Sequence, residues 1–271
     1  MRARFIASEG ERLDKLVSIN SKLSRKRARV VIERGGVRVD GKVQKRASHD
    51  VPQGALVEIR GSAPPRKSAS AELPERFRDR WLLVVDKPSG LPSQPTRQGH
   101  AQHLYGMLQG REEYVGLHHR LDTPASGLLL VTVDRSVNKA VSEAFRSGAI
   151  HRRYLAVVVG DPGESGTWDA PIANRPAKTH WRRLGSGDGL SLLECSLETG
   201  RTHQIRRHAV GAGAPIAGDR RHGGAAGRLW PRLALHAAGL SLTHPKTGEV
   251  VTVESPVPAD LAELVARCSD G

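Results

Sequence analysis

Apolar residues near the start of the chain follow helical spacing and then change to the alternation of strands. Apolar positions within 13–17 recur at helical intervals, and Ser24 is a plausible N-cap of a second helix that runs to Arg34. Valines then alternate on either side of an Asp-Gly turn at 40–41, and a third short strand is predicted over 56–59. This part of the chain therefore predicts two helices followed by a small sheet.

Further along, β-type apolar runs recur at irregular intervals, with helical stretches between them. The predicted strands are 81–85, 128–133, 154–159, 190–197, 233–242 and 250–253, and the predicted helices include 137–145 and 260–268. Because strands outnumber helices and their spacing is irregular, the pattern favours an α+β fold with a mixed or antiparallel sheet over a doubly wound fold.

A stretch without apolar periodicity separates these two regions. Residues 61–75 read GSAPPRKSASAELPE, and this richness in Pro, Ser and Ala is typical of an exposed linker. We therefore predict a small domain over 1–60, a linker over 61–75 and a larger domain over 76–271.

The charge of the chain indicates a polyanionic partner. Its 271 residues include 42 Lys and Arg against 28 Asp and Glu, a formal net charge of +14, and residues 1–60 hold 15 of these cations against 7 acids. No apolar run approaches the ~18 residues needed to span a membrane. The acidic residues among the first fifteen positions do not fit a secretion signal. We expect a cytoplasmic, monomeric protein that binds RNA and has no membrane partner.

The predicted second helix concentrates this charge in Arg25, Lys26, Arg27 and Arg29. The plain alternative is a solvated helix face, but among the acids of this helix only Glu33 offsets the cations. With a single aromatic residue in this region, base stacking is not available, so we expect RNA contacts through phosphates and shape.

The sequence gives little support for a metal or a nucleotide cofactor. It contains neither GxGxxG nor GxxxxGK[ST], and its two cysteines lack zinc-knuckle spacing. A zinc hydrolase would need the histidines His118, His119, His203 and His208 to converge, but HExxH and CxxC are absent and the last two fit one helix face poorly. We expect neither metal nor cofactor.

A first polar cluster, HHRLDTPASG at 118–127, precedes a predicted strand. It surrounds Asp122 with His and Arg on a loop, which suits an ionised nucleophile or base. The alternative is that Asp122 only caps a turn. Farther along, Tyr154 opens a strand among cations, although an isolated tyrosine is more often half-buried core.

A second cluster, ETGRTHQIRRH at 198–208, is typical of a helix N-terminus with Thr202 as its cap. Amide donors and arginines at such an end favour phosphate or carboxylate. Arg201 and Arg206 cannot point the same way on a helix, so we expect one to hold a carboxylate and the other to contact RNA. The residues of the larger domain that we expect to bind RNA are Arg120, Arg201, His203 and Arg207.

In this order the clusters resemble the RluA-type pseudouridine synthases, which isomerise uridine in large ribosomal RNA and some tRNAs. The matching segments are KPSGL, HRLDTPASG, RRYLAVV, GRTHQIRRH with PIAGD, and LHAAGLSLTHPKTGE. The front of the chain resembles the S4 RNA-binding domain in RLDKL, in Ser24-Arg25 and in GGVRVDG. Five ordered motifs make the resemblance specific.

The resemblance implies an RNA pseudouridine synthase that needs neither metal nor organic cofactor, with large-subunit rRNA the expected substrate and tRNA the second. It implies that Asp122 is the catalytic aspartate, Tyr154 the active-site tyrosine and Arg206 the arginine paired with the aspartate. Ala125 and His222 depart from the common threonine and tyrosine. The alternative is a non-catalytic RNA-binding or ribosome-assembly protein with a degenerate synthase domain.

Overall fold

The computed structural model describes residues 3–21, 23–33, 35–59, 73–95 and 102–268, without the side chains of Lys26 and Arg27. The chain divides into two compact units, one before position 60 and one after position 72. Most of the predicted linker, 61–75, lies outside the described residues. In the described part of the chain, no helix is long and apolar enough to cross a bilayer.

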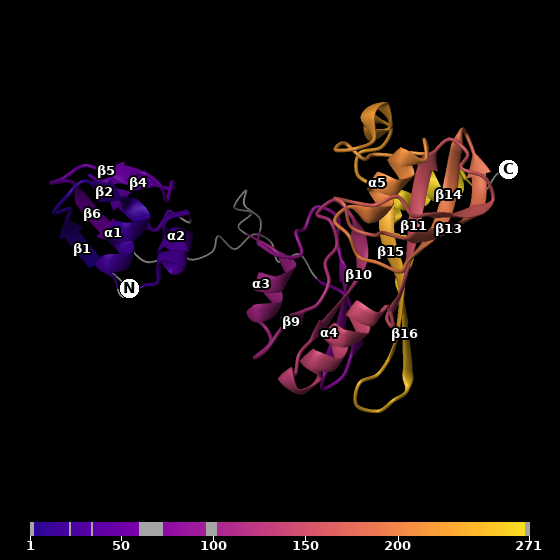
Figure 1. The fold of residues 1–271 in the computed structure, drawn as a ribbon, viewed down its shortest axis with the longest axis horizontal. Helices are drawn as coiled ribbons and strands as arrows, with labels where there is room; N and C mark the ends of the chain where they lie inside the picture. Colours follow the sequence, from indigo (N-terminus) through magenta and orange to yellow (C-terminus); the bar gives the residue numbers. More distant parts are fainter. Residues whose placement is uncertain (1–2, 22, 34, 60–72, 96–101, 269–271) are drawn as a thin grey trace. The chain divides into compact units, whose positions relative to one another are not determined.

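The first unit combines two short helices with two small sheets. The helices are α1 (Leu13–Ile19) and α2 (Arg25–Glu33). The main sheet has the order β1 (Ala3–Ile6), β6 (Leu56–Ile59), β3 (Val37–Val39) and β4 (Lys42–Gln44), and β2 (Glu11–Arg12) pairs with β5 (Asp50–Val51) (Figure 1). Both predicted helices and all three predicted strands are confirmed. The short strands β1, β2 and β5 were not predicted; β2 and β5 span only two residues each, too few to show an alternation.

A buried carboxylate joins the two helices of this unit. The Asp14 side chain has no exposed surface, and Arg29 Nε donates to it at 2.8 Å, with Arg25 and Arg12 at 3.3 and 3.2 Å. Burial alone would raise the pKa of Asp14, but the hydrogen bonds from these arginines outweigh it and hold the pKa well below its usual range. Two cations of α2, Arg25 and Arg29, are therefore offset by an acid on α1, which a count of the acids on α2 alone does not reveal.

The second unit is built on one mixed sheet. In spatial order its main strands are β12 (Ser165–Trp168), β13 (Thr179–Gly187), β14 (Leu190–Leu197), β11 (His151–Val159), β15 (Leu235–Thr243), β10 (Ser126–Thr132), β8 (Leu82–Lys87) and β7 (Glu75–Arg78). In addition, β16 (Val250–Glu254) pairs with β15 and β9 (Gly116–Leu117) pairs with β10. Only the β10–β15 pairing is parallel among the described strands. The predicted α+β fold with a mixed sheet is confirmed.

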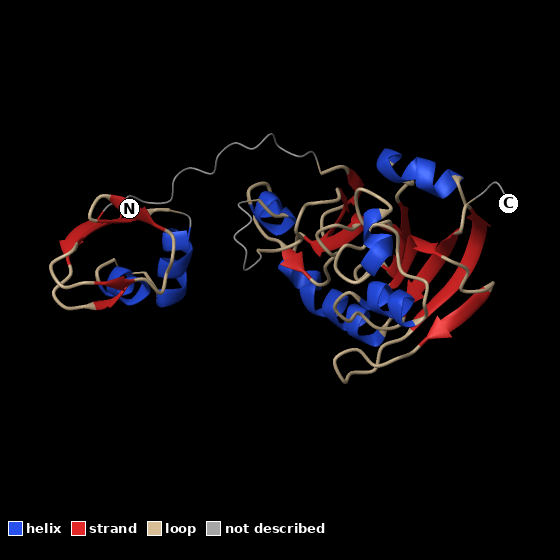
Figure 2. Ribbon diagram, turned by 90° about the horizontal axis from the view of Figure 1, so that it is seen from above, coloured by secondary structure: helices blue, strands red, loops and turns tan. Residues whose placement is uncertain are grey.

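Helices lie alongside this sheet (blue beside red in Figure 2). They are α3 (Leu104–Gln109), α4 (Asn138–Ser147), α5 (Gln204–Gly211) and α6 (Ala259–Ala266), with the 3-10 turns η1 (Arg135–Val137) and η2 (Gly224–Arg228). Every strand and helix predicted for this region has a counterpart, usually displaced by one to three residues. The long strand β13 was not predicted because its sequence, THWRRLGSG, is mostly polar.

Strand β10 is buried on both faces, as its unbroken apolar run suggests. Leu128 and Leu130 pack in one core cluster with α4, whereas Leu129 and Val131 pack in the other with α3 and α5. This division follows from the alternation of side chains along a strand. At its start, Gly127 has φ +110°, and a Cβ there would lie 2.3 Å from the Ala237 carbonyl oxygen. The start of β10 is thus held tightly against β15.

Candidate active site

A cleft of about 730 Å³ opens in the second unit between the loop before β10, strand β11 and the start of α5. Polar residues dominate its lining. The residues predicted to carry function that line it are Arg120, Asp122, Tyr154, Arg201, His203 and Arg206. These residues come from segments up to 86 positions apart, so the fold gathers them from separate motifs.

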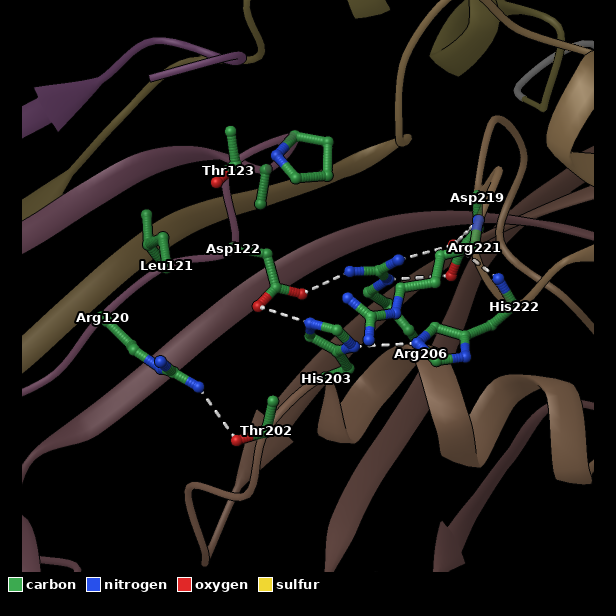
Figure 3. A network of polar contacts seen from close by, with 12 residues as sticks. Arg120, Leu121, Asp122, Thr123, Thr202, His203, Arg206, Asp219, Arg221 and His222 are labelled. Atoms are coloured by element: carbon green, nitrogen blue, oxygen red, sulfur yellow. Dashed lines mark hydrogen bonds and ion pairs between the residues drawn. The ribbon is translucent and has the colours of Figure 1, made fainter. Parts of the chain in front are cut away.

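Asp122 and Arg206 form the central ion pair of the cleft (Figure 3). Arg206 Nη1 donates to Asp122 Oδ2 at 2.8 Å, and the side chain of Asp122 is 18% exposed whereas that of Arg206 is 4% exposed. The arginine therefore holds one carboxylate oxygen from the protein side. The other oxygen, Oδ1, has His203 Nε2 at 3.7 Å.

Arg206 is itself fixed by a second, fully buried carboxylate. Its Nε and Nη2 donate to the two oxygens of Asp219 at 2.8 and 2.7 Å, which is a bidentate pair. Burial would raise the pKa of Asp219, but the arginine and the backbone N–H groups of Arg221 and His222 lower it below its usual value. Asp219 was not among the predicted site residues, although it stands in the PIAGD segment.

The arginine divides its donors between two carboxylates with different roles. The Nε and Nη2 edge of the guanidinium binds Asp219, which leaves Nη1 to donate to Asp122. Burial would lower the pKa of Arg206, but its hydrogen bonds to Asp219 and Asp122 raise it. A guanidinium held in this way cannot rotate freely, so it orients the Asp122 carboxylate as well as stabilising its charge.

The loop that carries Asp122 rests on a buried ammonium group. Lys87 Nζ, with its three N–H donors, lies within hydrogen-bonding distance of four carbonyl oxygens: Ala125 at 2.6 Å, Pro88 at 2.8 Å, Leu91 at 2.9 Å and Thr123 at 3.3 Å. Burial lowers the pKa of Lys87 to about 7. Two of these carbonyls follow Asp122 within three residues, so this lysine fixes the backbone that presents the carboxylate. The KPSGL segment gave no indication of this contact.

Tyr154 forms an apolar wall of the cleft. It sits on β11 with only 6% of its surface exposed, and it belongs to the large core cluster. Burial raises the pKa of its phenol, so the ring stays uncharged. A planar neutral ring at the edge of a polar cleft offers a surface on which a base can stack.

The start of α5 differs from the prediction. Thr202 is not the helix cap: the N-cap is His203, whose φ of +57° lies in the left-handed region, and no side chain caps the helix there. A Ser or Thr cap needs an extended backbone so that its oxygen meets the first amides. Thr202 instead accepts a hydrogen bond from Arg120 at 2.9 Å. The Gln204 side chain accepts from the Arg201 N–H at 3.0 Å.

The arginines of this segment have different partners, although Arg201 lies before α5 and not on it. That one of them contacts RNA stays a prediction. Arg206 holds carboxylates, whereas Arg201 is half-buried and its Nε donates to the Pro176 carbonyl at 2.9 Å. Arg207 is exposed on α5 and does not line the cleft.

The other predicted RNA-binding cations lie in the first unit. Arg25 and Arg29 pair there with Asp14. The side chains of Lys26 and Arg27 lie outside the described residues.

The histidines of the zinc alternative bond to different partners, although His118, His119 and His203 line the same cleft. His118 bonds Ser142 and Thr132, His208 bonds Thr179 and the Ala170 carbonyl, and His119 accepts from the Leu130 N–H. Over the described residues, no three His, Cys, Asp or Glu side chains gather as metal ligands would. The four histidines therefore do not converge.

Comparison with known proteins gives consistent results for both units. The family model for "RNA pseudouridylate synthase" matches residues 81–210, and the S4 domain model matches residues 11–57. Among solved structures, human RNA pseudouridylate synthase domain containing 4 aligns with a TM-score of 0.61 and 23% identity, covering 72% of this chain and 92% of that one. The human domain containing 1 protein aligns with a TM-score of 0.60 and 25% identity, covering 71% and 86%.

Curated relatives extend the similarity over nearly the whole chain. The ribosomal large subunit pseudouridine synthase D of Nitrosomonas europaea is 37% identical over 70% of this chain and 63% of its own length. An uncharacterized RNA pseudouridine synthase of Chloroflexus aurantiacus is 34% identical over 96% of this chain and 90% of its own. The ribosomal large subunit pseudouridine synthase D of Xanthomonas campestris is 32% identical over 96% and 89%.

Proposed function

We propose that this chain, which belongs to the RNA pseudouridine synthase family, isomerises specific uridines of large-subunit ribosomal RNA, with Asp122 as the catalytic carboxylate and no cofactor. The observation that carries the proposal is the hydrogen bond between Arg206 and Asp122 inside the cleft. Transfer RNA is the second candidate substrate. The names of the relatives from Nitrosomonas and Xanthomonas support ribosomal RNA.

The reaction needs little from the protein beyond one well-placed group. The N1–C1′ bond of uridine breaks, the base turns, C5 bonds to C1′, and the proton on C5 is released as N1 gains one. The composition of the nucleoside is unchanged, because the proton lost from C5 to solvent is matched by the one that N1 takes up. An ionised carboxylate serves this chemistry either by attacking C1′ or by removing a proton.

The proposed roles follow from the contacts of each residue. Asp122 turns its free oxygen to the cleft, and Arg206 holds the carboxylate in its orientation. Tyr154 provides the surface for the base once it leaves its stack. Extruding a nucleotide costs roughly a few kcal/mol, and stacking on an aromatic ring returns about 1–3 kcal/mol.

Cations then hold the RNA backbone around this centre. We propose that residues 76–271 form the catalytic domain and residues 1–60 the S4 RNA-binding domain, working as a cytoplasmic monomer. The proposed RNA contacts in the catalytic domain are Arg120, Arg201, His203 and Arg207. Those in the S4 domain are Arg25, Lys26, Arg27 and Arg29. Phosphate contacts of this kind set affinity and its salt dependence rather than the identity of the uridine.

The test is release of tritium from RNA transcripts labelled at C5 of uridine, with large-subunit rRNA and tRNA offered separately. We expect the wild type to release label from rRNA and Asp122→Asn to release none. Asp169→Asn, which changes an exposed carboxylate outside the cleft, is the matched control and should retain full activity.

The same assay separates the alternatives. A wild type that binds both RNAs but releases no tritium would identify a non-catalytic RNA-binding protein. Label released from tRNA alone would replace ribosomal RNA as the substrate. Activity retained by Asp122→Asn would remove the carboxylate from the mechanism.

A further inference from the structure

A second histidine lies behind His203 at the carboxylate end of the cleft. His203 Nδ1 and His222 Nε2 are 2.8 Å apart, and His203 Nε2 lies 3.7 Å from Asp122 Oδ1 (Figure 3). The ring centroids are 5.0 Å apart with an interplanar angle of 65°, so the two rings meet edge to face rather than stacked. The three side chains form a continuous series from His222 through His203 to Asp122.

The hydrogen bond between two neutral imidazoles requires one ring to donate and the other to accept. If His203 donated from Nδ1, its Nε2 lone pair would face the Asp122 carboxylate, which is repulsive. If His222 donates from Nε2, His203 carries its own proton on Nε2 and presents that N–H to Asp122 Oδ1. The second arrangement is favoured because it places a donor opposite the negative charge.

We propose that His222 is a positioning residue, which fixes His203 as the Nε2–H tautomer that faces the catalytic carboxylate. Its effect on catalysis rests on the proposed function, whereas the tautomer itself does not. His222 does not line the cleft, so it acts through His203 and not on the substrate.

Burial keeps this pair neutral. The groups that face the two rings are Asp122 from the loop before β10, Arg206 and Arg207 from α5, and Asp219 and Arg221 from the loop before η2. Burial is the largest effect and lowers the pKa of both histidines. Asp122 raises the pKa of His203 and Asp219 raises that of His222, whereas Arg206 and Arg221 lower both. At neutral pH each ring therefore carries one N–H proton, and only one proton lies between the two rings, as the tautomer argument requires.

Two variants of the full-length protein separate a donor from a merely structural ring. His222→Phe keeps an aromatic ring but cannot donate, whereas His222→Gln places a side-chain amide N–H close to the position of Nε2. Losing one neutral hydrogen bond predicts a fall in kcat of about two- to tenfold for His222→Phe. KM should stay within about twofold of the wild type because the cleft lining is untouched. His222→Gln should restore kcat to near the wild-type value.

The tautomer is read independently by nitrogen NMR of histidine-labelled protein at neutral pH. We expect His203 to show a protonated Nε2 in the wild type and in His222→Gln, and a mixture of tautomers in His222→Phe. A His203 protonated on Nδ1 in the wild type would overturn the proposal, as would equal kcat losses in both variants or no loss in His222→Phe. If the wild type proves inactive on every RNA offered, the proposed function fails, and the NMR result alone decides this inference.

Discussion

The two oxygens of the Asp122 carboxylate have different surroundings. One oxygen is held by Arg206, and the other faces the cleft beside His203. Behind them the buried Asp219 fixes the arginine. Charge and orientation of the carboxylate thus depend on a donor that serves two acceptors at once.

Replacing Arg206 by lysine tests this arrangement. A lysine keeps one positive charge but lacks the fork that meets Asp219 at two oxygens and Asp122 at a third point. We expect Arg206→Lys to lower kcat by at least about tenfold and to destabilise the second unit by about 1–3 kcal/mol. Tritium release and thermal unfolding measure the two effects. Arg111→Lys, an exposed change outside the cleft, serves as the control, and normal kcat in Arg206→Lys would contradict the role.

At the scale of elements, the loop before β10 is held from below by Lys87, whose ammonium group meets four carbonyl oxygens. Lys87→Met removes these hydrogen bonds, two of which hold the backbone just after Asp122. We expect kcat to fall by about tenfold or more, because a carboxylate displaced by a fraction of an ångström loses its geometry. Tritium release measures this fall. Lys139→Met, on an exposed side chain, is the matched control and should keep the wild-type kcat.

The lowered pKa of Lys87 predicts that the stability of the second unit depends on pH. Its pKa is lowered to about 7 in the fold, so between pH 7 and its ordinary value the unfolded chain binds more protons than the folded one. Stability should therefore rise as pH increases from 7 to 9, and Lys87→Met should lose this rise. The measurement is the free energy of urea unfolding of the second unit, for wild type and Lys87→Met, at several pH values between 7 and 9. An equal slope in wild type and variant would show that Lys87 is not the titrating group.

The helix pair of the first unit depends in a similar way on Asp14. Its pKa is depressed by three arginines, so its contribution is complete above about pH 4 and is lost as pH falls further. Asp14→Asn should cost about 1–3 kcal/mol at neutral pH, since it leaves half-exposed arginines without their buried partner. Glu9→Gln, an exposed change, should be neutral. Chemical unfolding of both variants at pH 7 and pH 3 provides the measurement.

The sequence predicted elements better than contacts. Runs such as 190–197 have strong periodicity, and the structure places β14 over the same residues. The polar strand β13 was not predicted because packing against its neighbours, not its own pattern, makes it a strand. Within the site, motifs led to Asp122 and Arg206. The contacts of Asp219 and His222, and those of Lys87 with the loop after Asp122, depend on segments that meet only in the folded chain, so no local pattern predicts them.

At the scale of the whole molecule, the positive charge is concentrated in the first unit. Residues 1–60 carry 15 Lys and Arg against 7 Asp and Glu, and this unit has its own core. Removing it should weaken RNA binding and reduce the slope of log affinity against log salt by about 0.7–0.9 for each phosphate that the truncated protein no longer neutralises. Single-turnover rates on saturating RNA should remain within about twofold of the full chain. An unchanged salt slope in the truncated protein would show that the S4 unit does not hold phosphates.

The central claim is that Asp122 catalyses pseudouridine formation at particular uridines, and cellular RNA offers its most direct test. Carbodiimide labelling and primer extension map pseudouridines in total rRNA and tRNA from cells carrying the wild type, a deletion, Asp122→Asn or Asp169→Asn. The account predicts that the same one or few stops in large-subunit rRNA disappear in the deletion and in Asp122→Asn and persist in Asp169→Asn. Persistence of every stop in Asp122→Asn would contradict it.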